Sequence, residues 1–209
     1  MSLGPIMMDL EGTGITPVER ELMENPLIGG IILFTRNFES IEQISALIAQ
    51  VHALRSPHLL VAIDHEGGRV QRFHDGFTRL PPARVFGGMY NDDADKARRC
   101  AEQAGWLLAA ELRAIGVDFS FTPVLDLAHG VSGVIGDRAY HSRPEIVATL
   151  AYATMRGMLR AGMQAVGKHF PGHGGVAEDS HLASPVDHRE LDVLLKEDIA
   201  PFAKMIAND

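Results

Sequence analysis

The sequence predicts an α/β protein, a TIM-type (β/α)8 barrel that is incomplete in this chain. Short apolar segments of strand length alternate with longer segments of helical periodicity. Polar side chains follow the ends of successive predicted strands, an arrangement typical of barrels. About five strand–helix units are recognisable, against the eight of a complete barrel. We therefore place residues 4–209 in the N-terminal part of a single barrel domain and regard residues 1–3 as a remnant of cloning.

Five apolar segments predict the strands of this barrel. Each is short and is bounded by Gly, Pro or polar residues, as expected of strands that are covered on both faces. The segments are residues 5–10, 30–34, 59–63, 118–121 and 164–167. Because a helical segment follows each of them, we expect the strands to be parallel.

The segments between the strands carry signals for helix starts. Four of them have Ser, Thr or Asp followed three residues later by Glu or Gln, the pattern of a capping box. These are Thr16–Glu19, Ser40–Gln43, Ser142–Glu145, which opens a helix to about Arg160, and Asp187–Glu190, which opens one that runs through Phe202. The longest predicted helix covers residues 95–115, and Gly116 is placed to end it.

A barrel competes with an open, doubly wound sheet. Asp64, Asp126 and the pair Lys168-His169 follow three successive predicted strands, which favours a barrel, because an open sheet binds ligands at one crevice. The first strand also lacks the G-x-G-x-x-G that would indicate a dinucleotide fold. The open sheet remains the alternative, since the chain stops at residues 206–209, where a sixth strand of the barrel is expected.

Composition excludes several classes of function. The formal net charge of −8 disfavours nucleic acid as a partner. There is no apolar run long enough to cross a membrane and no signal-peptide pattern at the N-terminus. A single cysteine, Cys100, forbids an internal disulfide and fits a reducing compartment. We expect a cytoplasmic protein with a small, uncharged or mixed-charge ligand.

A glycine-rich segment carries the most chemistry. Lys168-His169-Phe170-Pro171-Gly172-His173-Gly174 precedes Asp179-Ser180-His181 by a few residues. Lys168 and His169 are donors suited to ligand hydroxyls, and we expect His173 to brace the loop. In an extended loop, Asp179 and His181 project to the same side, and the carboxylate can fix the tautomer of an imidazole that transfers protons.

Two further segments supply candidate ligand-binding residues. In Asp64-His65-Glu66-Gly67-Gly68-Arg69-Val70-Gln71-Arg72, Asp64 can accept hydrogen bonds from a polar ligand and Arg72 can grip one. Glu66 and Arg69 are expected in internal ion pairs. In Gly136-Asp137-Arg138-Ala139-Tyr140, Arg138 is a candidate ligand clamp, and we expect Asp137 to hold the loop.

A metal site is the alternative to this interpretation of the loop. His169, His173, His181 and Asp179 are all metal-ligand types, and barrels often host catalytic zinc. However, these histidines lie on a glycine-rich loop, and the sequence contains no H-x-H or H-E-x-x-H. We therefore expect neither a metal nor another cofactor at this loop.

Taken in order, these motifs resemble the β-N-acetylhexosaminidases of glycoside hydrolase family 3. The motifs are D-H-E-G-G-R-V-Q-R, G-D-R-A-Y and K-H-F-P-G-H-G-x-x-x-x-D-S-H, and the resemblance extends from the first strand to the end of the chain. It is greatest to the single-domain bacterial type of peptidoglycan recycling. The sequence departs at Gly175, where much of the family has aspartate.

The resemblance implies a complete set of roles. His181, paired with Asp179, would be the general acid/base of a retaining hydrolase that removes terminal β-linked N-acetylglucosamine from peptidoglycan fragments. The sugar hydroxyls would be bound by a set of polar residues: Asp64, Arg138, Lys168 and His169, with Arg72 nearby. The nucleophile would be an aspartate on a later strand, beyond residue 209, so this chain alone should not complete the reaction.

Two other functions stay open, and one physical property is expected. The chain could belong to a metal-dependent barrel hydrolase, or it could be a non-catalytic carbohydrate-binding fragment. A shortened barrel would also expose strand edges and apolar helix faces. We therefore expect the chain to associate with itself.

Overall fold

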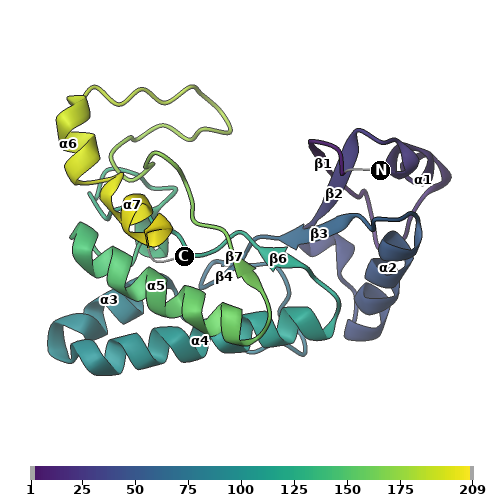
Figure 1. Cartoon of the computed structure of the whole chain (residues 1–209), viewed down its shortest axis with the longest axis horizontal. Coiled ribbons are helices and arrows are strands. Elements are labelled where there is room, and N and C mark those ends of the chain that lie inside the picture. Colours follow the sequence, from purple (N-terminus) through teal and green to yellow (C-terminus); the bar gives the residue numbers. More distant parts are fainter. Residues whose placement is uncertain (1–2, 208–209) are drawn as a thin grey trace.

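A five-stranded parallel sheet forms the centre of the computed structural model, which describes residues 3–207 (Figure 1). Of the three residues attributed to cloning, Met1 and Ser2 lie outside this range. The strands are β1 (Ile6–Asp9), β2 (Ile28–Leu33), β3 (Leu60–Ile63), β6 (Phe119–Ser120) and β7 (Gln164–Ala165). Their order in the sheet, β1-β2-β3-β6-β7, is also their order in the chain. A doubly wound sheet reverses its order, so the predicted incomplete barrel is confirmed over the open-sheet alternative.

Helices connect the strands, as the periodicity predicted. They are α1 (Pro17–Glu24), α2 (Ile41–Ala53), α3 (Ala83–Asp92), α4 (Ala94–Ala114), α5 (Pro144–Arg160), α6 (Leu191–Lys196) and α7 (Ala200–Ile206), with short 3-10 turns at Thr35–Asn37 and Gly136–Arg138. Between β7 and α6 the chain runs as a long extended loop (Figure 1). Among residues 3–207, no helix combines the length and apolar character needed to cross a bilayer.

The helix starts were predicted with mixed success. Thr16 and Glu19 form the predicted capping box of α1. Ser40 caps α2 by accepting from the backbone N–H of Gln43, but the Gln43 side chain accepts from the N–H of Glu39, so the box is incomplete. Asp93, not a residue of the predicted motifs, caps α4. Gly116 ends that helix with a φ of 97°, as its placement indicated.

The remaining two starts had different outcomes. Helix α5 begins at Pro144, inside the segment Ser142–Glu145, and ends at Arg160 as predicted, although no side chain caps it. The last predicted helix is two helices, and the carboxylate of Asp187 accepts from Arg189 instead of capping them. Pro201 accounts for the division, because proline lacks the N–H that a continuous helix needs and its ring clashes with the preceding turn.

Two elements were missed by the sequence analysis. An antiparallel hairpin, β4 (His65–Gly67) and β5 (Val70–Gln71), follows β3 directly. Gly67 and Gly68 have φ values of 97° and 57°, and this left-handed backbone turns the chain at once after the strand. Helix α3 contains the pair Gly87-Gly88, a poor helix-forming sequence, so its propensity gave little indication of a helix.

Two buried apolar clusters hold the elements together. The first joins the sheet to α2 and α4, and its largest buried members include Leu10, Ile31, Leu47, Ile63 and Leu112. The second lies among α3, α4 and α5 and includes Phe86, Leu125, Leu127, Tyr140 and Leu150. Leu125 and Leu127 flank Asp126, so the second cluster fixes the segment that follows β6 at the carboxyl edge of the sheet.

Helices α4 and α5 approach each other closely through glycines. A methyl group on Gly105 of α4 would collide with the carbonyl oxygen of Thr154 in α5. In the reverse direction, a methyl group on Gly157 of α5 would collide with the carbonyl oxygen of Glu102 in α4. The lack of side chains at these two positions therefore sets the distance between the helices.

Candidate functional site

The carboxyl ends of the strands bring a network of charged side chains together. Lys168, which follows β7, lies with its Nζ 2.7 Å from Oδ1 of Asp64 and 2.6 Å from Oε1 of Glu66. Arg72 approaches the other oxygen of Asp64 at 3.4 Å. Asp64 directly follows β3 and Glu66 lies in the hairpin after it, so two neighbouring parts of the barrel edge supply the partners of Lys168.

Arg138 joins this network from the loop after β6. Its Nε and Nη2 lie 2.9 and 2.7 Å from the two oxygens of Glu66, which is bidentate pairing. Its Nη2 also lies 3.3 Å from Nε2 of His169. Arg138 therefore connects the carboxylate of Glu66, which pairs with Lys168, to the imidazole of His169.

Asp126, which is fully buried, fixes His169 from the other side. Its Oδ2 lies 2.6 Å from Nδ1 of His169, and its Oδ1 accepts from the backbone N–H of His173 at 2.7 Å. A carboxylate at Nδ1 and a guanidinium at Nε2 select the tautomer with its proton on Nδ1. The ring of His169 is thus oriented by ionic partners at both nitrogens.

The network favours the charged forms of Asp64 and Arg138. Burial would raise the pKa of Asp64, but the nearby Lys168 and Arg72 outweigh burial and hold that pKa below its ordinary value. Burial would lower the pKa of Arg138, and Glu66 outweighs it and raises that pKa. Three carboxylates and three cations thus lie at one edge of the sheet, and we name this set the charged cluster: Asp64, Glu66, Arg72, Asp126, Arg138 and Lys168, with His169 attached.

The predicted pair of Asp179 and His181 also forms. Nδ1 of His181 lies 2.7 Å from Oδ1 of Asp179, and the same oxygen accepts from the backbone N–H of His181 at 2.9 Å. These two hydrogen bonds, the backbone one first, lower the pKa of the Asp179 carboxyl. With Nδ1 engaged, Nε2 is the nitrogen available for proton transfer, and the His181 side chain is 83% exposed.

The predicted site residues therefore fall into two groups. Asp64, Arg72, Arg138, Lys168 and His169 lie together in the charged cluster. Asp179 and His181 lie on the loop between β7 and α6, and within residues 3–207 no hydrogen bond or ion pair joins them to the cluster.

Both ends of the loop are anchored. At its start, the backbone of His173 is held by Asp126, which fits the predicted bracing role, although the buried ring nitrogens of His173 have no hydrogen-bond partner in the described part of the chain. At its end, the Arg189 guanidinium pairs with Asp187, Glu197 and Asp198. The segment that carries Asp179 and His181 is thus exposed between two fixed points.

Sequence reasoning missed two residues of the charged cluster. Glu66 forms the internal ion pair expected of it, with Arg138, but it also pairs with Lys168, which was not predicted. Asp126 was noted after a strand but not assigned to the site. The strand-end position of Asp126 and the closeness of Glu66 to Asp64 were the available signals. Arg69 and Asp137 pair with each other at 3.1 Å and hold their loops, as expected for Asp137.

Two groups of side chains in the described residues have the geometry to hold a metal ion. One is His52, His58 and Asp118, and the other is His129, Glu197 and Asp198. Neither contains the loop residues His169, His173, Asp179 and His181, whose side chains are also of metal-ligand types.

Comparison with known proteins places the chain in a family. A model of the glycosyl hydrolase family 3 N-terminal domain matches residues 7–209. The chain belongs to glycosyl hydrolase family 3. This confirms the resemblance stated from the motifs, which covers the same part of the chain.

Named relatives within glycosyl hydrolase family 3 share a large part of the sequence. Over 206 residues, or 99% of this chain, it is 65% identical to the beta-hexosaminidase of Thioalkalivibrio sulfidiphilus. It is 55% identical to that of Methylobacillus flagellatus over 206 residues. In both comparisons the chain covers 59% of the relative. The chain thus spans about three fifths of the length of these curated relatives.

Solved structures agree with the fold. NagZ from Neisseria gonorrhoeae, crystallised with N-trifluoroacetyl-D-glucosamine, superposes with a TM-score of 0.97 at 51% identity, over 100% of this chain and 62% of that one. A family 3 β-N-acetylglucosaminidase from Paenibacillus sp. superposes with a TM-score of 0.88 at 36% identity, over 97% of this chain and 38% of the other.

Proposed function

We propose that this chain forms the sugar-binding and acid/base part of a retaining glycoside hydrolase that removes terminal, non-reducing β-linked N-acetylglucosamine. The observation that carries the proposal is the charged cluster at the carboxyl ends of the strands, together with a His–Asp pair on the loop that follows its lysine. The names of the relatives support the same reaction and sugar.

The charged cluster suits a ligand with several hydroxyl groups. Lys168 and Arg138 carry N–H donors, and Asp64 carries acceptor oxygens, all held in place by their mutual ion pairs. A sugar that enters can exchange some of these contacts for contacts with its hydroxyls. His169, whose ring is fixed by Asp126, would add a directed contact from the same edge.

Proton transfer is assigned to His181. In the first step its Nε2 donates a proton to the glycosidic oxygen while the bond to the anomeric carbon breaks and a carboxylate of the enzyme bonds to that carbon. In the second step Nε2 takes a proton from water, the water oxygen bonds to the anomeric carbon, and the carboxylate leaves. Asp179 stabilises the imidazolium in each cycle. We propose that the complete protein supplies the nucleophile from a strand later than those described.

The finer assignments are also proposals. The motif resemblance favours peptidoglycan fragments of the N-acetylglucosaminyl-anhydromuramyl type as substrates, and recycling of these fragments in the bacterial cytoplasm as the role. A single cysteine and the motif resemblance support this location.

The decisive experiment assays the full-length protein and its His181→Ala variant on two aryl β-N-acetylglucosaminides. One should have a good leaving group, nitrophenol, and the other a poor one, an unsubstituted or alkyl phenol. Loss of a general acid should lower kcat/KM by about 10²–10⁴-fold on the poor leaving group, and by less on nitrophenol, which needs little protonation.

His188→Ala is the matched control, because His188 is an exposed histidine on the same loop. It should retain wild-type kinetics. The assignment fails if the wild type does not turn over either substrate, or if His181→Ala behaves like the wild type. Tight binding of N-acetylglucosamine to the 209-residue chain without turnover by the full-length protein would instead support a carbohydrate-binding module.

A further inference from the structure

A second set of metal-ligand side chains lies at the opposite end of the strands from the charged cluster. His52 is in the last turn of α2, His58 lies just before β3, and Asp118 lies just before β6. In a parallel sheet the starts of the strands share one edge and their ends share the other. These three residues are therefore at the amino edge, whereas Asp64 and Lys168 follow the carboxyl ends.

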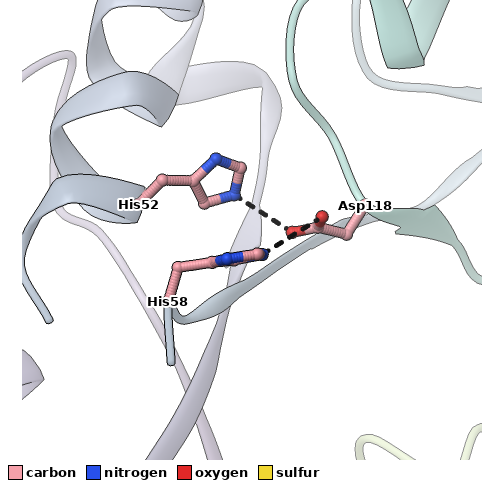
Figure 2. Close-up of side chains that lie close together, drawn as sticks. All are labelled: His52, His58 and Asp118. Atoms are coloured by element: carbon pink, nitrogen blue, oxygen red, sulfur yellow. Dashed lines mark hydrogen bonds and ion pairs between the residues drawn. The ribbon is translucent and has the colours of Figure 1, made fainter. Parts of the chain in front are cut away.

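We propose that His52, His58 and Asp118 bind one divalent transition-metal ion of the zinc class. Figure 2 shows both imidazole rings directed at the carboxylate of Asp118. Nε2 of His52 lies 3.1 Å from Oδ2, and Nε2 of His58 lies 3.7 Å from Oδ1. One ligand atom from each residue lies within 4.8 Å of the other two.

These distances fit tetrahedral coordination. Ligand atoms bound about 2.0–2.1 Å from a zinc ion at tetrahedral angles lie roughly 3.3 Å from one another. The observed 3.1 and 3.7 Å are on either side of this value. Small side-chain rotations would therefore bring the ligands into place without moving the backbone.

The carboxylate is already oriented for this role. Oδ2 of Asp118 accepts from the backbone N–H of Val61 at 2.8 Å, an outer-shell contact of the kind that positions metal ligands. Within residues 3–207, its ion pairs are with the two histidines only, so no lysine or arginine occupies the position of the ion. The group of His129, Glu197 and Asp198 differs, because Arg189 already pairs with both carboxylates.

The donor set and its exposure select the kind of ion. Two imidazole nitrogens and one carboxylate oxygen suit Zn²⁺, Co²⁺, Ni²⁺ or Cu²⁺, whereas Mg²⁺ and Ca²⁺ prefer oxygen ligands alone. The Asp118, His52 and His58 side chains are 17%, 27% and 51% exposed, which lets an ion enter with water as the fourth ligand. Bound metal would tie the end of α2 to the starts of β3 and β6.

The test uses Zn²⁺ or Co²⁺ alone with the metal-free 209-residue chain. Calorimetric titration with Zn²⁺ should give one ion per chain at this site, and Co²⁺ should produce the visible absorption of a low-coordinate nitrogen–oxygen site. A Zn²⁺ concentration about a hundredfold above Kd should raise Tm by about 5–10 °C. Mg²⁺ should neither bind at this site nor raise Tm.

Variants distinguish this site from the loop residues. His58→Gln, at a half-exposed position, and Asp118→Asn, which keeps an oxygen acceptor for Val61, should each weaken Zn²⁺ binding at least about tenfold while circular dichroism stays native. The His188→Gln and His181→Gln variants should bind Zn²⁺ with the affinity of the wild type.

The proposal is overturned if the wild type binds no Zn²⁺, or if His181→Gln abolishes binding while His58→Gln and Asp118→Asn do not. It does not depend on glycosidase activity, because none of these measurements involves turnover of a sugar.

Discussion

At the scale of single residues, the charged cluster is defined by shared partners. Lys168 has two carboxylate partners, and Glu66 has two cationic partners, Lys168 and Arg138. Removal of one member therefore leaves the others partly paired. The cost of a substitution should be smaller than for an isolated buried ion pair, where the remaining charge has no partner.

The Asp64→Asn substitution should make the free energy of unfolding depend less on pH in the acid range. The pKa of Asp64 is lower in the folded state than the usual value near ~3.9, so its stabilising effect is complete above about pH 4 and is lost as the pH falls through the folded pKa. The variant should be less stable by about 1–3 kcal/mol near pH 7. Tm measured between pH 7 and pH 3 should show the two proteins converging in acid.

Asp75→Asn is the control for that comparison, because Asp75 is an exposed carboxylate outside the cluster. The Tm of this variant should equal that of the wild type at every pH between 7 and 3. A constant difference between Asp64→Asn and the wild type across the whole pH range would contradict the assigned direction of the pKa shift.

Individual residues also show what could be predicted from sequence. Asp64, Lys168 and His169 were predicted because each follows an apolar strand, and parallel strand ends meet at one edge. Glu66 was not placed in the cluster, because it does not follow a predicted strand directly but lies in the β4–β5 hairpin, which the sequence pattern did not predict. The distance between the Asp179–His181 pair and the cluster depends on a loop, whose path no periodicity encodes.

At the scale of elements, two helical glycines should respond in opposite ways to replacement by alanine. Only one of them lies where α4 and α5 approach each other closely. Gly105→Ala should destabilise the protein by about 1–3 kcal/mol, because the collision with the Thr154 carbonyl exceeds the helix-propensity gain of about 1 kcal/mol. Gly88→Ala in α3 should stabilise it by up to about 1 kcal/mol, since the new methyl group meets no atom within 4 Å.

Urea denaturation of both variants measures this contrast. Equal effects, or a stabilised Gly105→Ala, would mean that the two helices can separate without cost. The expected opposite signs would show that the interhelical distance is fixed by packing and not by helix propensity.

At the scale of the whole molecule, the sheet has two strands with one partner each. β1 pairs only with β2, and β7 only with β6, among the strands of this sheet in the described residues. Ile6 in β1 is exposed, and so are several apolar side chains beyond β7: Phe170, Leu182, Val186 and Leu191. Open edges and apolar surface favour association between chains.

We therefore predict that the 209-residue chain self-associates as its concentration rises. Multi-angle light scattering at several concentrations should show a mass above the 22.7 kDa of one chain. A longer chain in which further strands pair with β1 and β7 should not show this increase. A monodisperse monomer of the 209-residue chain at high concentration would contradict the prediction.

The carboxylate of Asp126 also limits how this site could be changed by evolution or protein engineering. One of its oxygens orients the ring of His169, and the other holds the backbone at the start of the loop that carries His181. A replacement at this position would therefore alter the orientation of the His169 ring and the position of the loop together. A substitution at Arg72, whose ion pair among the described residues is with Asp64, would leave this loop in place, whereas at Asp126 no change is independent.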